Sequence, residues 1–91
     1  VNLEEVEAAA RQTGLARECL AMGLPDEDWG ERLTLFCVAS GLAAEELKRA
    51  LSKKLSGARL PKEVLLVDAL PLNEMGKPDF AAALRLVSGT G

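Results

Sequence analysis

Apolar residues recur along this chain with two different periods, and the changes of period divide it into helices and strands. Helical spacing between charged positions predicts three helices, over residues 3–13, 43–55 and 80–87. Alternating or nearly continuous apolar runs, rich in strand-forming residues, predict three strands, over residues 15–22, 33–39 and 63–68. The predicted order is therefore helix, strand, strand, helix, strand, helix.

Short polar signals mark where the helices begin and end. Asn2 is a suitable N-cap for the first helix, and Glu5 three residues later has the spacing of a capping box. Gly14 has the position of a glycine that ends this helix. Asp79 is a suitable N-cap for the last helix. The last helix has one predicted apolar stripe, formed by Phe80, Ala83, Leu84 and Val87.

The connections between these elements favour an α+β fold built on a small three-stranded sheet. The polar stretch 23–32 is predicted to be a loop too short for a helical crossover, so strands 15–22 and 33–39 should pair antiparallel. Residues 33–39 lack polar alternation, which is typical of a central strand covered on both faces. About three helices would then pack on the sheet, in a single domain over residues 1–91.

Composition and charge exclude several classes of function. The chain has 91 residues, a formal net charge of −3, one Trp and two Phe, so it lacks the basic surface and the aromatic platform of a nucleic-acid binder. No apolar run is long enough to span a membrane and no signal peptide is evident, which predicts a cytoplasmic protein. Because Val1 lies at the start of the first helix, we expect the chain to be a fragment of a longer protein.

Few side chains are available for catalysis. The chain has no His, which excludes a Ser-His-Asp or Cys-His arrangement within it. Cys19 and Cys37 lie in apolar, strand-like runs and are interpreted as buried structural thiols. A disulfide between them stays open if their strands pair, although nothing indicates an oxidising compartment. The carboxylate cluster Asp26, Glu27 and Asp28 lacks the spacing of a metal site and is interpreted as a solvated turn, so we predict no metal site.

One loop has the features needed to present a cation. Lys77 follows Gly76 and precedes Pro78, just ahead of the last helix. Gly76 can adopt a positive φ, and Pro78 biases Lys77 toward an extended conformation that presents its ammonium group. Residues 32–91 hold nine basic and six acidic side chains, a balance that suits an anionic ligand near Lys77. Taken alone, this loop fits either an anion contact or a solvated turn, and the solvated turn is the commoner case.

Four segments together resemble a known family. They are Val1–Glu7, which resembles V-S/N-P-x-E-V-E; Met22–Arg32, which resembles V-G-x-P-D-x-x-W-G-E-x; Ala58–Pro61, which resembles Y-K-x-P; and Leu70–Lys77, which resembles L-P-x-x-x-x-G-K. In order and spacing they resemble the small C-terminal lid domain of the adenylate-forming enzyme superfamily. This superfamily includes acyl-CoA synthetases, nonribosomal peptide adenylation domains and luciferases. Ala58 departs from the pattern, where the family has Tyr.

The resemblance implies a reaction in two half-steps. A carboxylic acid and ATP give an acyl-adenylate and pyrophosphate, and a thiol, usually CoA or a carrier-protein pantetheine, then captures the acyl group. Carried over from the family, Lys77 would contact the substrate carboxylate and the α-phosphate oxygens of ATP, with Gly76 supporting its loop. Arg59 stands where the family often has Lys, and is interpreted as a surface residue or as an interdomain or phosphate contact. ATP and Mg²⁺ would be bound mainly by a large N-terminal domain, which would lie upstream of Val1 together with the hinge.

The pattern around Lys77 favours an acyl-CoA ligase within this superfamily. Leu70–Leu72 and Gly76–Asp79 resemble the corresponding segments of some o-succinylbenzoate–CoA ligases. The alternatives are the lid of a nonribosomal-peptide-type adenylation domain that loads a carrier protein, and a stand-alone binding module without catalysis. The segment 29–31 is interpreted as a packed turn. Without the large domain, the chain itself is expected to be catalytically silent.

Overall fold

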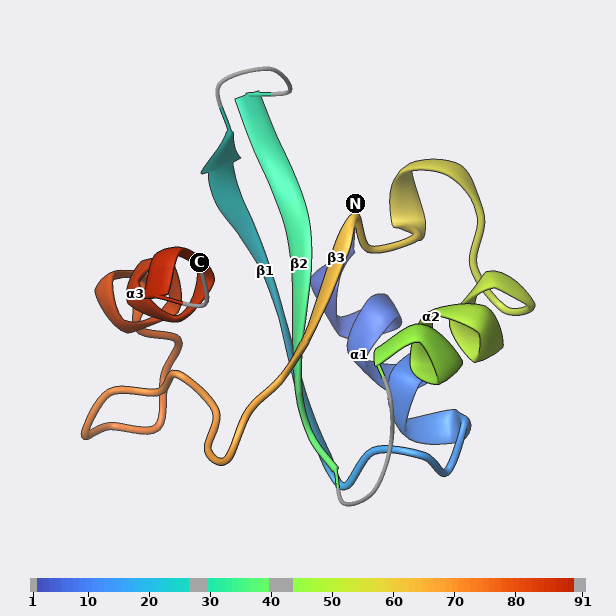
Figure 1. The fold of residues 1–91 in the computed structure, drawn as a ribbon, viewed down its shortest axis with the longest axis horizontal. Helices are drawn as coiled ribbons and strands as arrows, with labels where there is room; N and C mark the ends of the chain where they lie inside the picture. The colour runs from blue at the N-terminus through green and yellow to red at the C-terminus, as the bar shows by residue number, and fades with distance from the viewer. Residues whose placement is uncertain (1, 27–29, 40–43, 90–91) are drawn as a thin grey trace.

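The computed structural model describes residues 2–26, 30–39 and 44–89, and Figure 1 shows its fold. The elements follow one another as α1 (Leu3–Gln12), β1 (Glu18–Asp26), β2 (Gly30–Val38), α2 (Ala44–Ser52), the short 3₁₀ helix η1 (Gly57–Arg59), β3 (Glu63–Leu66) and α3 (Phe80–Gly89). The predicted order of helices and strands is confirmed, with η1 as an addition. Within the described residues, no helix has both the length and the apolar character needed to cross a membrane.

The three strands form one mixed sheet in the order β1, β2, β3. β1 and β2 pair antiparallel along nine residues each, and β3 pairs parallel to β2 after a crossover through α2. α1 and α2 cover one face of the sheet and α3 lies on the other, as Figure 1 shows. The α+β prediction is confirmed, including a central strand buried on both faces, since Leu35, Phe36 and Cys37 of β2 are fully buried.

The long β1–β2 hairpin corrects the prediction of a polar loop over residues 23–32. Pairing continues until Asp26 lies opposite Gly30, and buried Leu24 keeps one side of β1 apolar almost to the turn. Pro25 is tolerated because β1 is an edge strand, where a missing N–H on the outer side breaks no sheet bond. The polar residues near the turn therefore belong to the strands. The local pattern of apolar and polar positions does not indicate this.

Two predictions about the turn of this hairpin, a solvated carboxylate cluster and a packed turn over residues 29–31, are corrected for the residues that the structure describes. Asp26 is not a solvated turn residue, because its side chain is buried and pairs with Arg32 at 2.6 Å. Gly30 and Glu31 begin β2 and are exposed, so they do not form a packed turn. The remaining residues of those two predictions, Glu27, Asp28 and Trp29, lie outside the described residues.

α1 is capped as predicted, but without the full capping box. Asn2 Oδ1 accepts hydrogen bonds from the backbone N–H groups of Glu4 at 2.9 Å and Glu5 at 3.3 Å. The Glu5 carboxylate does not return to Asn2, because the guanidinium group of Arg59 binds it instead. Gly14 follows the helix with a φ of +74°, as expected for a glycine that ends a helix.

The outer edge of β1 is partly closed by α1. Glu7 Oε2, on α1, accepts a hydrogen bond at 2.9 Å from the backbone N–H of Ala21. This N–H points away from β2, toward the side of β1 on which no further strand pairs among the described residues. A carboxylate therefore occupies a position at which a further strand would otherwise pair.

The two faces of the sheet have separate cores. The face under α1 and α2 holds a large cluster of buried residues: Val6, Ala9, Ala10, Cys19, Ala21, Leu35, Cys37, Leu47, Leu51, Leu55 and Val64. The face under α3 holds a smaller cluster: Leu20, Met22, Leu24, Phe36 and Ala83. The alternation of side chains along β1 and β2 sends odd-numbered residues to the first cluster and even-numbered ones to the second.

Cys19 and Cys37 are buried, free thiols, as the sequence predicted. They lie directly opposite each other on β1 and β2, with their sulfur atoms 3.8 Å apart, so the strands pair but no disulfide is formed. The Cys37 thiol donates a hydrogen bond to Cys19 Sγ, and this bond together with burial raises the pKa of Cys37.

The predicted apolar stripe of α3 is only partly correct. Ala83 is buried, and Leu86 and Val87 pack beside it on the smaller cluster. Phe80, by contrast, is 56% exposed, and Leu84 is also exposed. Phe80 and Leu84 are four residues apart and share a neighbouring stripe, because α3 meets the sheet along the line of Ala83 and Val87.

Candidate functional site

The loop that carries Lys77 joins β3 to α3 and lies on the α3 side of the sheet (Figure 1). Its two ends are held together by backbone contacts, since Leu72 and Pro78 form an isolated antiparallel bridge. The Asp79 N–H also donates to the carbonyl of Pro71 at 2.9 Å, and Pro71 itself is buried. The loop is thus anchored at its base and exposed at its tip.

Asn73 organises the tip of this loop. Its side-chain Oδ1 accepts hydrogen bonds from the N–H groups of Met75 at 2.8 Å and Lys77 at 3.1 Å. Its backbone carbonyl accepts from the Gly76 N–H at 2.9 Å, and its own N–H donates to the Lys77 carbonyl at 2.8 Å. Gly76 has a φ of +78°, which confirms the expected left-handed conformation.

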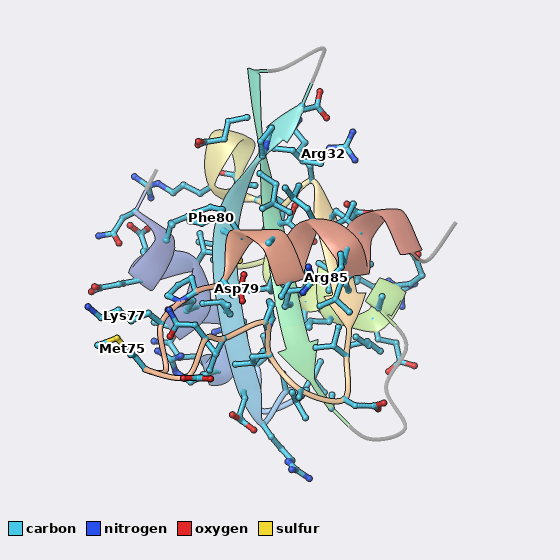
Figure 2. The ribbon with its side chains drawn as sticks, turned by 90° about the vertical axis from the view of Figure 1, so that its left-hand side faces the viewer. Arg32, Met75, Lys77, Asp79, Phe80 and Arg85 are labelled. Carbon is cyan, nitrogen blue, oxygen red and sulfur yellow. The ribbon has the colours of Figure 1, made fainter. Side chains whose placement is uncertain are left out.

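The Lys77 side chain is exposed, and no carboxylate pairs with it among the described residues. Figure 2 shows that Lys77 and Met75 lie at the same edge of the molecule and point away from the sheet. Directly after the loop, Asp79 caps α3, because its Oδ1 accepts from the Ala82 N–H at 3.1 Å. An ammonium group without a carboxylate partner among the described residues, on a loop held by internal hydrogen bonds, is available to bind an anion.

Four large apolar side chains on the Lys77 loop and on α3 are exposed. We call Leu72, Met75, Phe80 and Leu84 the apolar patch; Met75 is 79% exposed. Figure 2 shows Phe80 at the first turn of α3. Large exposed apolar side chains near a functional group are typical of a surface that another part of a protein covers.

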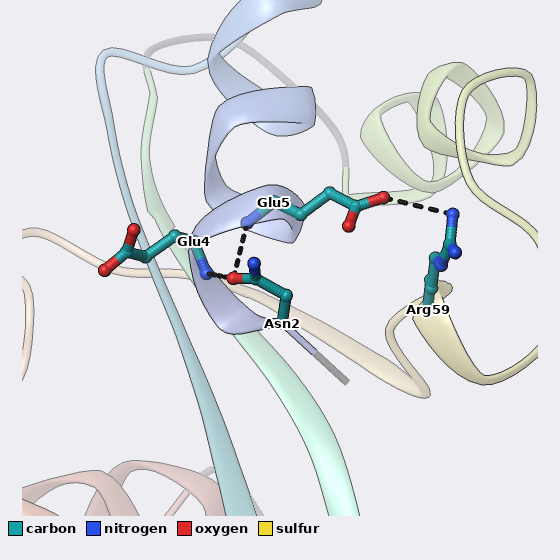
Figure 3. Close-up of polar contacts among 4 residues, drawn as sticks. All are labelled: Asn2, Glu4, Glu5 and Arg59. Atoms are coloured by element: carbon teal, nitrogen blue, oxygen red, sulfur yellow. Dashed lines mark hydrogen bonds and ion pairs between the residues drawn. The ribbon is translucent and has the colours of Figure 1, made fainter.

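Arg59 is not brought near Lys77. It belongs to η1, on the side of the sheet that carries α1 and α2, whereas the Lys77 loop lies on the α3 side (Figure 1). Its guanidinium group pairs with Glu5 Oε1 at 3.1 Å, and both side chains are largely exposed (Figure 3). Arg59 is therefore a surface residue with a partner in this chain, and it remains accessible to solvent.

A charged cluster at the hairpin end of the sheet escaped the sequence prediction. Arg32 pairs with Asp26 at 2.6 Å and lies 3.6 Å from Glu63 Oε1, which links the three strands. The cluster borders a surface pocket of about 320 Å³ that Thr34 also lines. Because Arg32 is already neutralised by two carboxylates, this pocket has no free cation to attract a phosphate. The local pattern does not indicate this cluster, because Asp26 and Arg32 come together only when residues 23–32 pair as two strands.

Asn73 was also missed, although its sequence context contains a signal. Asn is a common residue for turns in which a side-chain oxygen accepts from N–H groups further along the chain. A glycine three residues later supports such a turn.

The described residues contain no group of three or more His, Cys, Asp or Glu side chains able to hold a metal ion.

The chain is similar in sequence to known CoA ligases. A medium/long-chain fatty acid–CoA ligase of Mycobacterium tuberculosis is 33% identical over 99 residues, covering 97% of this chain and 17% of the ligase. A 2-succinylbenzoate–CoA ligase of Lactococcus lactis is 31% identical over 74 residues, covering 81% of this chain and 16% of that protein. The chain thus spans about a sixth of the length of these curated relatives.

The fold agrees with these sequence relationships. The solved structure of ATP-bound MatB from Rhodopseudomonas palustris matches this chain with a TM-score of 0.77 at 28% identity, covering 93% of this chain and 17% of MatB. Residues 5–77 match the AMP-binding enzyme C-terminal domain, a span that ends on Lys77. This chain belongs to the AMP-binding enzyme C-terminal domain family.

Proposed function

We propose that this chain is the C-terminal domain of an AMP-forming acid–thiol ligase of the acyl-CoA synthetase type. The whole enzyme would activate a carboxylic acid with ATP to an acyl-adenylate and then transfer the acyl group to CoA. Support comes from the family match and from two relatives whose names state CoA ligase activity. The proposal keeps the expectation of a cytoplasmic enzyme and of a longer chain with a large N-terminal domain.

The observation that carries the proposal is the exposed ammonium group of Lys77, which pairs with no carboxylate among the described residues. It extends from a loop held by hydrogen bonds within the loop itself. In adenylate formation, negative charge accumulates on the oxygens of the ATP α-phosphate while the substrate carboxylate attacks. A positioned ammonium group stabilises such charge, most strongly in a site from which water is excluded. Lys77 would contact the carboxylate and the α-phosphate, and Gly76 would allow the turn that presents it.

The large domain is the partner that the proposal requires. Lys77 alone does not enclose a nucleotide, so most contacts to ATP and to the acid must come from outside this chain. The apolar patch, on the Lys77 loop and α3, suits docking on such a domain, because docking would cover Phe80 and Met75 and exclude water. The described residues contain no group of three or more His, Cys, Asp or Glu side chains able to hold a metal ion, and we derive no step through a metal bound by this domain.

Arg59 has no part in adenylate formation under this proposal. One docked arrangement cannot turn both faces of the sheet toward the same ligand, and Arg59 lies on the face opposite Lys77. Arg59 would instead form an interdomain or phosphate contact in another step. In the full-length protein, Arg59→Ala should therefore leave adenylate formation unchanged.

The test is Lys77→Ala in the full-length protein, with the two half-reactions measured separately. Adenylate formation, measured by ATP–pyrophosphate exchange, should fall by about 10²- to 10³-fold. Transfer of the acyl group from supplied acyl-adenylate to CoA should survive. Lys53→Ala, which removes an exposed ammonium group just after the last residue of α2, is the matched control.

Three outcomes would contradict the proposal. Equal loss of both half-reactions would remove the assigned role of Lys77. Transfer to a carrier-protein pantetheine rather than to CoA would favour the lid of a nonribosomal-peptide-type adenylation domain. A coding sequence that begins just before Val1 would indicate a stand-alone binding module.

A further inference from the structure

The geometry points to Asn73 as a positioning residue for Lys77 in adenylate formation, a role that rests on the proposed function. Both backbone polar groups of Lys77 are bonded to Asn73: its N–H binds the Asn73 side chain, and its carbonyl binds the Asn73 N–H. The N–H groups of Met75 and Gly76 also converge on Asn73. One residue therefore fixes the backbone from which the reactive side chain extends.

The side chain of Asn73 accepts two of the four hydrogen bonds that hold the tip of the loop, and the other two join backbone groups. Glu74, Met75 and Gly76 are all exposed, so no buried side chain anchors the tip. A glycine also widens the range of conformations open to the backbone. The two bonds to Oδ1 favour one of these conformations, and the bond from the Lys77 N–H joins the last residue of the turn to the first.

Misplacement of Lys77 should slow the reaction even though its ammonium group is still present. A shift of about 1 Å in a positioned group can cost on the order of 10²-fold in rate. Loss of two loop hydrogen bonds makes the productive conformation rarer by about 5- to 100-fold. The effect of removing the Asn73 side chain should therefore be smaller than that of removing Lys77.

The experiment uses the full-length protein and the same two half-reactions. Asn73→Ala should lower kcat for adenylate formation by about 5- to 100-fold and change the KM for ATP little, because the lost hydrogen bonds position Lys77, whose ammonium group acts in the transition state. Acyl transfer from supplied acyl-adenylate should be unaffected. Hydrogen–deuterium exchange should also become faster in a peptide that covers residues 73–77.

Two matched variants separate the hydrogen bonds from other effects. Asn73→Asp keeps an acceptor oxygen on a stem of the same length and should restore both the exchange protection and most of the rate. Glu74→Ala truncates the next residue, whose exposed side chain has no hydrogen bond or ion pair with another described residue. This control should behave as the unmodified protein does.

A double variant tests whether Asn73 acts through Lys77. If it does, adding Asn73→Ala to Lys77→Ala should cause no further loss of adenylate formation. A further loss in the double variant, equal loss of both half-reactions, or a normal rate in Asn73→Ala would each overturn the role of Asn73. These results differ from failure of the proposed function, which would appear as normal adenylate formation in Lys77→Ala itself.

Discussion

The two faces of this sheet are covered very differently. Under α1 and α2 the side chains interlock in one large buried cluster, in which Leu47 and Leu51 are fully buried. On the other side, Ala83 is the only described side chain of α3 that is completely buried, and Phe80 and Leu84 are exposed. The comparison teaches that the first face supplies most of the stability of the domain, while the second keeps apolar surface and a cation available for contact.

The largest expected effect is on the first face. Leu47→Ala removes a fully buried side chain and should lower the free energy of unfolding by about 2–5 kcal/mol. Leu72→Ala makes the same chemical change on the α3 side, where Leu72 is 41% exposed, and should cost less than about 1 kcal/mol. Urea denaturation of the 91-residue chain measures both values. Similar losses in the two variants would break the comparison.

The thiol pair of the first face makes stability depend on pH. A raised pKa keeps Cys37 protonated in the native state, while in the unfolded chain the thiol ionises near its ordinary value of 9.0. The native state then binds more protons, so the free energy of unfolding should fall above about pH 9, by up to about 1.4 kcal/mol per pH unit. Denaturation midpoints from about pH 8 to about pH 10, below the usual lysine range, measure this slope.

A variant without thiols provides the control for that slope. Cys19→Ala combined with Cys37→Ala should unfold more easily at every pH, because both thiols are buried, but should lose the decline above about pH 9. An unchanged decline in this variant would assign it to other groups.

Removing the N-cap of α1 and that of α3 should have different effects on stability, which compares the two faces in smaller steps. Asn2→Ala removes the cap of α1 and should lower the free energy of global unfolding by about 1 kcal/mol. Asp79→Ala removes the cap of α3, a helix with few buried contacts, and should act mainly on local opening. Hydrogen exchange should therefore rise in α3 with a smaller shift of the global midpoint. Equal global shifts would show that α3 is as tightly coupled as α1.

The smallest effect is expected for the ion pair between Arg59 and Glu5. Both side chains are largely exposed, so solvent screens their attraction. A double-mutant cycle with Arg59→Ala and Glu5→Ala should give a coupling energy of about 0.2–1 kcal/mol at low salt. The coupling should vanish in about 1 M salt. A large coupling that resists salt would mean that this surface is more rigid than its exposure indicates.

Local pattern was sufficient for the elements but not for how they meet. The helices and strands follow from periodicity, because helical spacing and apolar runs are properties of short segments. The hairpin was underestimated since Asp26 looks solvated until Arg32 is known to lie near it across the turn. Phe80 was assigned to the buried stripe because the sequence does not say along which line α3 touches the sheet.

The candidate site was only partly predictable from the sequence. Lys77 and Gly76 could be singled out from the loop residues, and the resemblance gave them a role. Asn73 was not singled out, because its importance lies in where three N–H groups point, and that depends on the closed shape of the loop. Turn residues with side-chain acceptors near a reactive lysine are therefore worth examining even when their own chemistry is unremarkable.

The carboxylate of Glu7 has a consequence for association between copies of this protein. A sheet with two free edges and exposed apolar side chains is at risk of pairing with other chains. Here one edge has its Ala21 N–H occupied by Glu7, and the other edge is a strand of four residues. The domain can thus expose Phe80 and Met75 for contact while one sheet edge is interrupted at Ala21 and the other edge is short.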